Sequence, residues 1–76
     1  MDYKNIFSSR LHDLRAKKAL SQKALADVIG LSDAAITMLE KGKRSPSFEV
    51  LCALAEFFDV SLDYLVGRTD NPNINR

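Results

Sequence analysis

One face of a predicted helix carries side chains whose spacing could serve to read a nucleic acid. Residues that recur three or four positions apart share one side of a helix, and the outward set of this kind is Asp33, Ala34, Thr37, Met38 and Lys41. Ile36 and Leu39 point the opposite way, into a core. A short helix that is buried on one side and presents such a ladder on the other fits the major groove of DNA.

Two short helices joined by a tight turn would position this face. The pattern predicts helices over residues 22–29 and 33–41. Ser21 and Ser32 are suitable N-caps, and Gly30 ends the first helix because glycine adopts positive φ at no steric cost. Two helices separated by a few residues, with a glycine between them, predict the helix-turn-helix geometry.

The rest of the chain predicts three further helices, each after an asparagine or serine N-cap, at about 5–18 (Asn5), 48–58 (Ser47) and 62–66 (Ser61). The inward residues of the first two are Ile6, Phe7, Leu11 and Leu14, and Phe48, Leu51, Leu54, Ala55 and Phe58. Residues 1–4 are expected to form a loose end and residues 68–76 a flexible C-terminal tail. The expected fold is therefore one compact, all-α domain of five helices over residues 1–67.

The composition excludes several classes of protein. The chain of 76 residues has one cysteine, Cys52, so it has no intramolecular disulfide and no cysteine-based metal site, as expected for a reducing compartment. No apolar run approaches the roughly 20 residues that cross a bilayer, and the first residues do not resemble a signal peptide. We therefore expect a cytoplasmic protein, associated with the nucleoid when bound to DNA, that does not interact with a membrane.

Charge is distributed unevenly. Residues 1–46 carry nine Lys and Arg against five Asp and Glu, or +4, whereas residues 47–76 carry two against five, or −3. This polarity fits phosphate contact on one side of the domain, and a chance asymmetry on a solvated surface is the alternative. His12 is the only histidine, and no phosphate loop or nucleophile motif accompanies it. We therefore expect no enzyme, no cofactor, no metal and no small-molecule ligand.

Five motifs in order carry a family resemblance: L-S-Q at 20–22, L-A-x-x-I-G at 25–30, I-x-x-L-E-x-G at 36–42, P-S-F at 46–48 and V-S-L-D-Y-L at 60–65. Over residues 7–67 the chain resembles the Cro/CI-type (XRE) helix-turn-helix repressors, which have the lambda-repressor-like fold. The resemblance implies a bacterial or phage transcription regulator, more often a repressor, that binds double-stranded operator DNA with its third helix in the major groove.

The resemblance also implies roles for individual residues. The base-reading face would be Ser32, Asp33, Ala34, Thr37 and Met38. The phosphate contacts would come from Ser21, Gln22, Lys41, Lys43, Arg44 and Ser45. Gln22 would also buttress the recognition helix. Arg15 and Glu40 match a family ion pair that orients the recognition helix.

The expected reading face has no Gln, Asn or Arg. Ala34, Thr37 and Met38 can contact thymine methyl groups, and Asp33 can accept a hydrogen bond from the amino group of cytosine. Asp33 is equally explained as a carboxylate that stabilises the start of its helix. Both interpretations stay open, and DNA shape is a further source of specificity.

Self-association is a second implication of the resemblance, because relatives bind near-palindromic sites as dimers. The apolar residues left over after building a core are Phe57, Leu62, Tyr64 and Val66, which we expect to form a homodimer interface. The alternative is that they belong to the core, which is favoured for Leu62. A protein-binding module on the same fold, such as an antitoxin or adaptor, is the competing function. Exposed Ala34 and Met38 would suit it, whereas the basic loop and Gln22 favour DNA.

Overall fold

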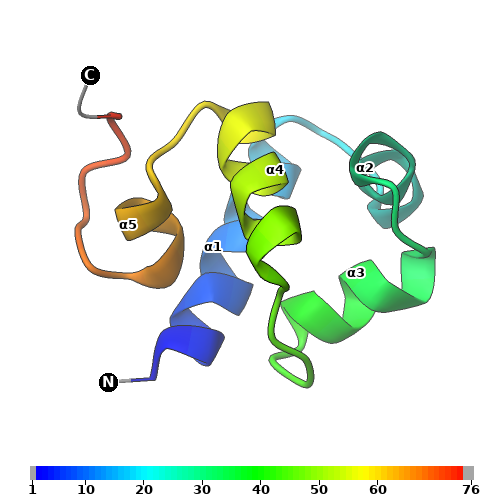
Figure 1. Cartoon of the computed structure of the whole chain (residues 1–76). Helices are drawn as coiled ribbons and strands as arrows, with labels where there is room; N and C mark the ends of the chain where they lie inside the picture. Colours follow the sequence, from blue (N-terminus) through cyan, green and yellow to red (C-terminus); the bar gives the residue numbers. More distant parts are fainter. Residues whose placement is uncertain (1, 75–76) are drawn as a thin grey trace.

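Five helices make up the part of the chain that the computed structural model describes, residues 2–74 (Figure 1). They are α1 (Tyr3–Lys17), α2 (Gln22–Ile29), α3 (Asp33–Glu40), α4 (Phe48–Phe58) and α5 (Leu62–Val66), and the described residues contain no strand. In Figure 1, α1 runs behind α4 at the centre, α2 and α3 lie to one side and α5 to the other. The predicted all-α, five-helix architecture is confirmed.

Serine residues begin four of the five helices. In each case the side-chain oxygen accepts a hydrogen bond of 3.0–3.2 Å from a backbone N–H of the first turn, and the capping residues are Ser21, Ser32, Ser47 and Ser61. Gly30 and Gly67 end α2 and α5 with φ of 82° and 87°. These local signals give α2, α4 and α5 the predicted bounds, while α1 and α3 end one residue earlier than predicted, at Lys17 and Glu40.

The first helix begins earlier than predicted. Its N-cap is Asp2, whose carboxylate accepts from the backbone N–H of Asn5 at 3.3 Å and from the Asn5 side chain at 2.5 Å. Asn5 is therefore a first-turn residue and not the cap, because Asp2 reaches two of its donors at once. The predicted loose end over residues 1–4 is wrong for the two residues that start α1, and Met1 lies outside the described residues.

All five helices contribute to one core, whose largest fully buried side chains are Phe7, Leu11, Leu25, Ile36, Leu39, Leu54 and Leu65. Of the other predicted inward residues, Ala55 and Phe58 are buried, and Ile6, Leu14 and Leu51 are partly buried. Phe48 contradicts the prediction, since 74% of it is exposed. Side chains lean toward the N-terminus of their helix, so this first residue of α4 projects past the end of the helix, where no neighbour covers it.

Residues 68–74 lie against α1 and α5. The guanidinium of Arg10 donates to three acceptors at 2.6–2.8 Å, the carbonyls of Tyr64 and Thr69 and the carboxylate of Asp70. The backbone N–H of Ser61 donates to the carbonyl of Pro72 at 3.0 Å. Arg10 thus contacts this segment through residues 59 and 60 positions away that no local pattern connects to it, and the flexibility of the tail stays a prediction. Residues 75–76 lie outside the described part, and the domain boundary after residue 67 stays a prediction.

Candidate nucleic-acid interface

α2 and α3 meet in an elbow whose inner side is packed. Gly30 turns the chain, and the backbone N–H groups of Gly30 and Leu31 both donate to the carbonyl of Ala26, at 2.8 and 2.9 Å. Both helices send side chains into the core beneath the elbow, namely Leu25 and Ala26 from α2 and Ala35, Ile36 and Leu39 from α3. The inner side therefore fixes α3 in place while its outer side stays accessible.

The residues predicted to read bases lie on the outer side of the elbow. The exposed positions are Ser32, Asp33, Ala34 and Met38, and the partly buried one is Thr37. Ser32 also caps α3, since its hydroxyl oxygen accepts from the N–H of Ala35 at 3.1 Å. Asp33 lies in the first turn of α3, where a carboxylate favours the helix, so the structure is compatible with both interpretations of this residue.

An ion pair joins α1 to the end of α3. Arg15 Nε and Nη2 donate to the two carboxylate oxygens of Glu40, at 2.5 and 3.0 Å, and Nη1 donates to the carbonyl of Leu20 at 2.7 Å. Only 15% of the Arg15 side chain and 5% of the Glu40 side chain are exposed. The hydrogen bond to Glu40 raises the pKa of Arg15 above its ordinary value, while burial acts in the opposite direction. The pair that the family resemblance implies is thus present.

Gln22 and Thr37 extend this ion pair into a network across the elbow. Gln22 Nε2 donates to Glu40 Oε1 at 3.2 Å, and the Thr37 hydroxyl is 2.6 Å from Gln22 Oε1. The family resemblance implies that Gln22 buttresses the recognition helix, but it does not identify these two partners, which lie 18 and 15 positions away in the sequence. The one signal for this network was the Glu40 carboxylate itself. After binding Arg15 with both oxygens it can still accept further hydrogen bonds, so another donor was to be expected beside it.

The loop between α3 and α4 carries free cations. Lys41 caps the C-terminal end of α3, Lys43 and Arg44 follow it, and all three side chains are exposed, as are Ser45 and Ser21. Among the described residues, no carboxylate forms an ion pair with any of these three cations, although Arg10, Arg15, Lys23 and Arg68 all have one. This loop follows directly after α3 (Figure 1), so its charge lies at the C-terminal end of that helix.

The four residues expected at a dimer interface have different surroundings. Phe57 is partly buried and packs edge-on against Phe58, with ring centroids 4.9 Å apart. Tyr64 lies under the Arg10 guanidinium, 4.1 Å from its ring centroid. Val66 is partly buried, whereas 41% of Leu62 is exposed, so the core role favoured for Leu62 is wrong. At the very start of α5 its side chain reaches the surface.

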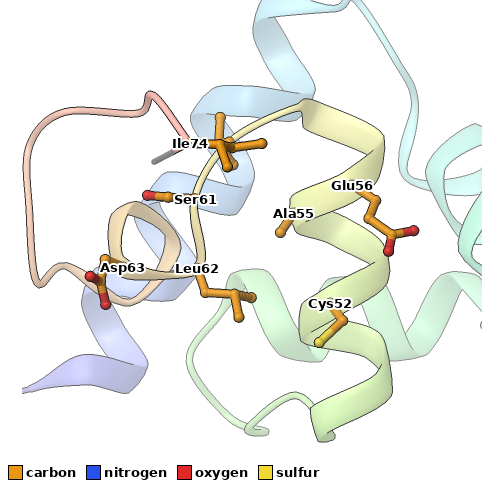
Figure 2. Close-up of a pocket in the computed structure, with 8 residues that line it drawn as sticks. Cys52, Ala55, Glu56, Ser61, Leu62, Asp63 and Ile74 are labelled. Carbon is orange, nitrogen blue, oxygen red and sulfur yellow. The ribbon is translucent and has the colours of Figure 1, made fainter. Parts of the chain in front are cut away.

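Leu62 lines an open apolar cavity of about 450 Å³ between α4 and α5. Figure 2 shows Cys52, Ala55 and Glu56 on the α4 side of this cavity, with Leu62 and Ile74 facing them. Within residues 2–74, no group of three or more His, Cys, Asp and Glu side chains is arranged to hold a metal ion. None of the helices in this range has the length and apolar character that crossing a lipid bilayer requires.

Known proteins are similar to this chain in sequence. A helix-turn-helix family model matches residues 11–65. The HTH-type transcriptional regulator AnsR of Bacillus subtilis is 42% identical over 59 residues, which are 78% of this chain and 51% of AnsR. The uncharacterized HTH-type transcriptional regulator YqaE of the same organism is 36% identical over 69 residues, which are 91% of this chain and 60% of YqaE. The chain thus spans 51–60% of the length of these two relatives.

A solved structure also corresponds closely to this one. The P22 c2 repressor protein, crystallised in complex with synthetic operator 9T, matches with a TM-score of 0.75 and 33% identity, over 79% of this chain and 91% of that chain.

Proposed function

We propose that this chain, which belongs to the helix-turn-helix family, binds double-stranded DNA sequence-specifically and regulates transcription. The family assignment agrees with the Cro/CI-type resemblance of its motifs. A relative of similar fold, the P22 c2 repressor protein, was crystallised with operator DNA, and that supports the same ligand class here.

One observation carries the proposal: the accessible side of α3 adjoins three exposed cations that have no carboxylate partner among the described residues. A helix with its side chains is about 10–12 Å across, so α3, a helix of 8 residues, fits within a major groove about 12 Å wide. Lys41, Lys43 and Arg44 would then lie near phosphates, with Ser21, Gln22 and Ser45 as polar neighbours.

We further propose that the chain acts as a dimer on a near-palindromic operator, as a repressor. Half-sites one turn apart place two recognition helices about 34 Å from each other, and the longest dimension of this domain is 30 Å. Two copies side by side can therefore span such a site. The exposed Leu62 beside the α4–α5 cavity supports self-association on this side of the domain, with Phe57, Tyr64 and Val66 as less exposed members of the interface.

A protein-binding module on the same fold is the second candidate. The exposed apolar side chain of Met38, 42% accessible, favours it together with Ala34. The free cations of the α3–α4 loop favour DNA, since a protein groove for an apolar helix face does not require them.

Selection of bound duplexes from a random DNA pool at near-physiological salt separates the two candidates. Enrichment of a near-palindrome with half-sites about one turn apart is the expected result. Enrichment of a single half-site would contradict the dimer. Weak, salt-sensitive binding without any enriched sequence would contradict the function, because phosphate contact alone gives affinity without sequence preference.

A further inference from the structure

In the network around Glu40, the donor and the acceptor of every hydrogen bond can be assigned in only one way. The Glu40 carboxylate accepts two bonds from Arg15 and can only accept from Gln22 as well. The Gln22 amide therefore turns its NH₂ group to Glu40, at 3.2 Å, and its carbonyl oxygen to Thr37, at 2.6 Å. A carbonyl oxygen has no hydrogen to give, so the Thr37 hydroxyl must donate.

Because Thr37 is the donor to Gln22, its hydroxyl has no hydrogen left to donate to DNA. Its one hydroxyl hydrogen has two acceptors within reach, Gln22 Oε1 at 2.6 Å and the Asp33 carbonyl at 3.1 Å. Both acceptors belong to the protein. Thr37 can therefore offer a partner only its methyl group and the lone pairs of its oxygen.

The outward residues between the two caps of α3 also lack donors, whereas the caps themselves, Ser32 and Lys41, keep a hydroxyl hydrogen and an ammonium group. The carboxylate of Asp33 accepts, Ala34 presents a methyl group, and Met38 presents a thioether. In the major groove, guanine shows two acceptors, N7 and O6, which only a donor can bind. Adenine and cytosine show amino hydrogens there and thymine shows a methyl group, and these are the features that acceptors and methyl groups match.

We propose that Thr37 is a positioning residue for Gln22, and that the donor-free outward stretch from Asp33 to Met38 recognises thymine methyl groups and the amino groups of adenine and cytosine, not guanine. This rests on the proposed function, since it requires α3 in the major groove, and it specifies the chemistry of the half-site. Gln22, held by Thr37 and Glu40, keeps one amide hydrogen uncommitted, which is left to donate to a phosphate oxygen.

Base analogues in an enriched duplex test the recognition chemistry. Uracil removes the methyl group of thymine, and 7-deazaguanine removes the N7 acceptor of guanine. With the full chain, uracil at a position facing α3 should lower affinity about fourfold, the value of one buried methyl-sized group. Replacing guanines that face the stretch from Asp33 to Met38 by 7-deazaguanine should change affinity by less than about twofold, whereas a lost bidentate contact would cost about tenfold or more.

Two variants of Thr37 test the positioning role. Thr37→Val keeps the shape but leaves Gln22 Oε1 without a donor, so affinity for every duplex should fall about fivefold, the value of one hydrogen bond. In a Gln22→Ala background the same substitution should have almost no effect, because Thr37 acts through Gln22. Thr37→Ser keeps the hydroxyl and loses the methyl group. Because the hydroxyl still holds Gln22, this variant should keep the contribution of Gln22 to affinity. Because the methyl group is missing, it should lose the sensitivity to uracil at one position. Thermal unfolding of each variant checks that it folds.

Three results would overturn the proposal. One is a tenfold loss with 7-deazaguanine that Thr37→Val abolishes, because Thr37 would then donate to guanine. Another is the absence of any uracil effect in the half-site. The third is an equal effect of Thr37→Val with and without Gln22. All three require an enriched sequence, so they differ from failure of the proposed function, in which no sequence is enriched.

Discussion

Arg15 on α1 and Gln22 on α2 bind side chains of α3 and so hold its outer side in position. The Arg15–Glu40 pair is mostly buried and bidentate, and such geometry is what allows a buried pair to offset the desolvation of its charges. Gln22 depends on the same carboxylate. A change at Glu40 should therefore affect both the stability of the domain and the orientation of Gln22, which we propose faces DNA.

Glu40→Gln should lower the free energy of unfolding by about 2–3 kcal/mol, because the guanidinium of Arg15 keeps its buried position without a counter-charge. Urea unfolding followed by circular dichroism measures this. The matched control is Asp27→Asn, which breaks an exposed pair with Lys23 whose side chains are 70% and 65% accessible, and should change stability by less than about 0.5 kcal/mol. Equal stability of Glu40→Gln and the parent would show that the pair does not support the fold.

The sequence predicted individual residues well where the deciding contact is local or typical of the family. Arg15 and Glu40 came from the resemblance, and the outward position of Met38 from helical spacing. The bond from Thr37 to Gln22 depends on how two helices cross, and helical spacing describes only one helix at a time. For that reason its consequence for base recognition emerged only from the three-dimensional arrangement.

Among the elements, we expect the α3–α4 loop to determine the affinity for DNA and α3 to determine the sequence preference. Lys43→Gln and Arg44→Gln should each weaken binding to all duplexes alike and flatten the slope of log K against log salt by about 0.9, the value of one phosphate contact. Titrations at several salt concentrations measure the slope. Arg68→Gln is the control, because Arg68 is paired with Asp63 on α5. A change in sequence preference, with the slope intact, would mean that the loop reads bases.

Two glycines that end helices differ in what surrounds them. Gly30 and Gly67 both have positive φ, but a Cβ at Gly30 would meet nothing within 4 Å, whereas one at Gly67 would overlap the side chain of Ile6 on α1. Gly30→Ala should cost about 1–2 kcal/mol from its backbone alone. Gly67→Ala should cost about 1–3 kcal/mol more, because the packing of α5 on α1 must open. Equal losses in urea unfolding would contradict this close approach.

Helix bounds were predictable where serine caps and glycine stops are unambiguous, as at Ser21 and Gly30. They failed at the start of α1, where Asp2 and Asn5 are both good caps and only the structure shows which one accepts. The exposure of Phe48 was missed for a related reason: periodicity assigns a face to a residue, but does not show where the neighbouring helices end.

At the scale of the whole molecule, residues 68–74 complete the surface around α5. Truncation of the chain after Gly67 should lower the free energy of unfolding by about 1–3 kcal/mol, because Arg10 and the N–H of Ser61 both lose acceptors. Urea unfolding of the two lengths tests this together with the predicted domain boundary. Identical stability would show that the segment contributes nothing in solution.

The Arg10 clamp has a consequence for how long the native state lasts. It joins residues 54–60 positions apart, so closing it before the intervening chain is ordered costs the entropy of a long loop. We therefore expect it to form after the rate-limiting step of folding. Stopped-flow measurements on Arg10→Met should show faster unfolding with an unchanged folding rate, whereas slower folding would place the clamp in the nucleus. Arg10 would then act on the lifetime of the folded domain, and with it on how long each copy resists proteolysis.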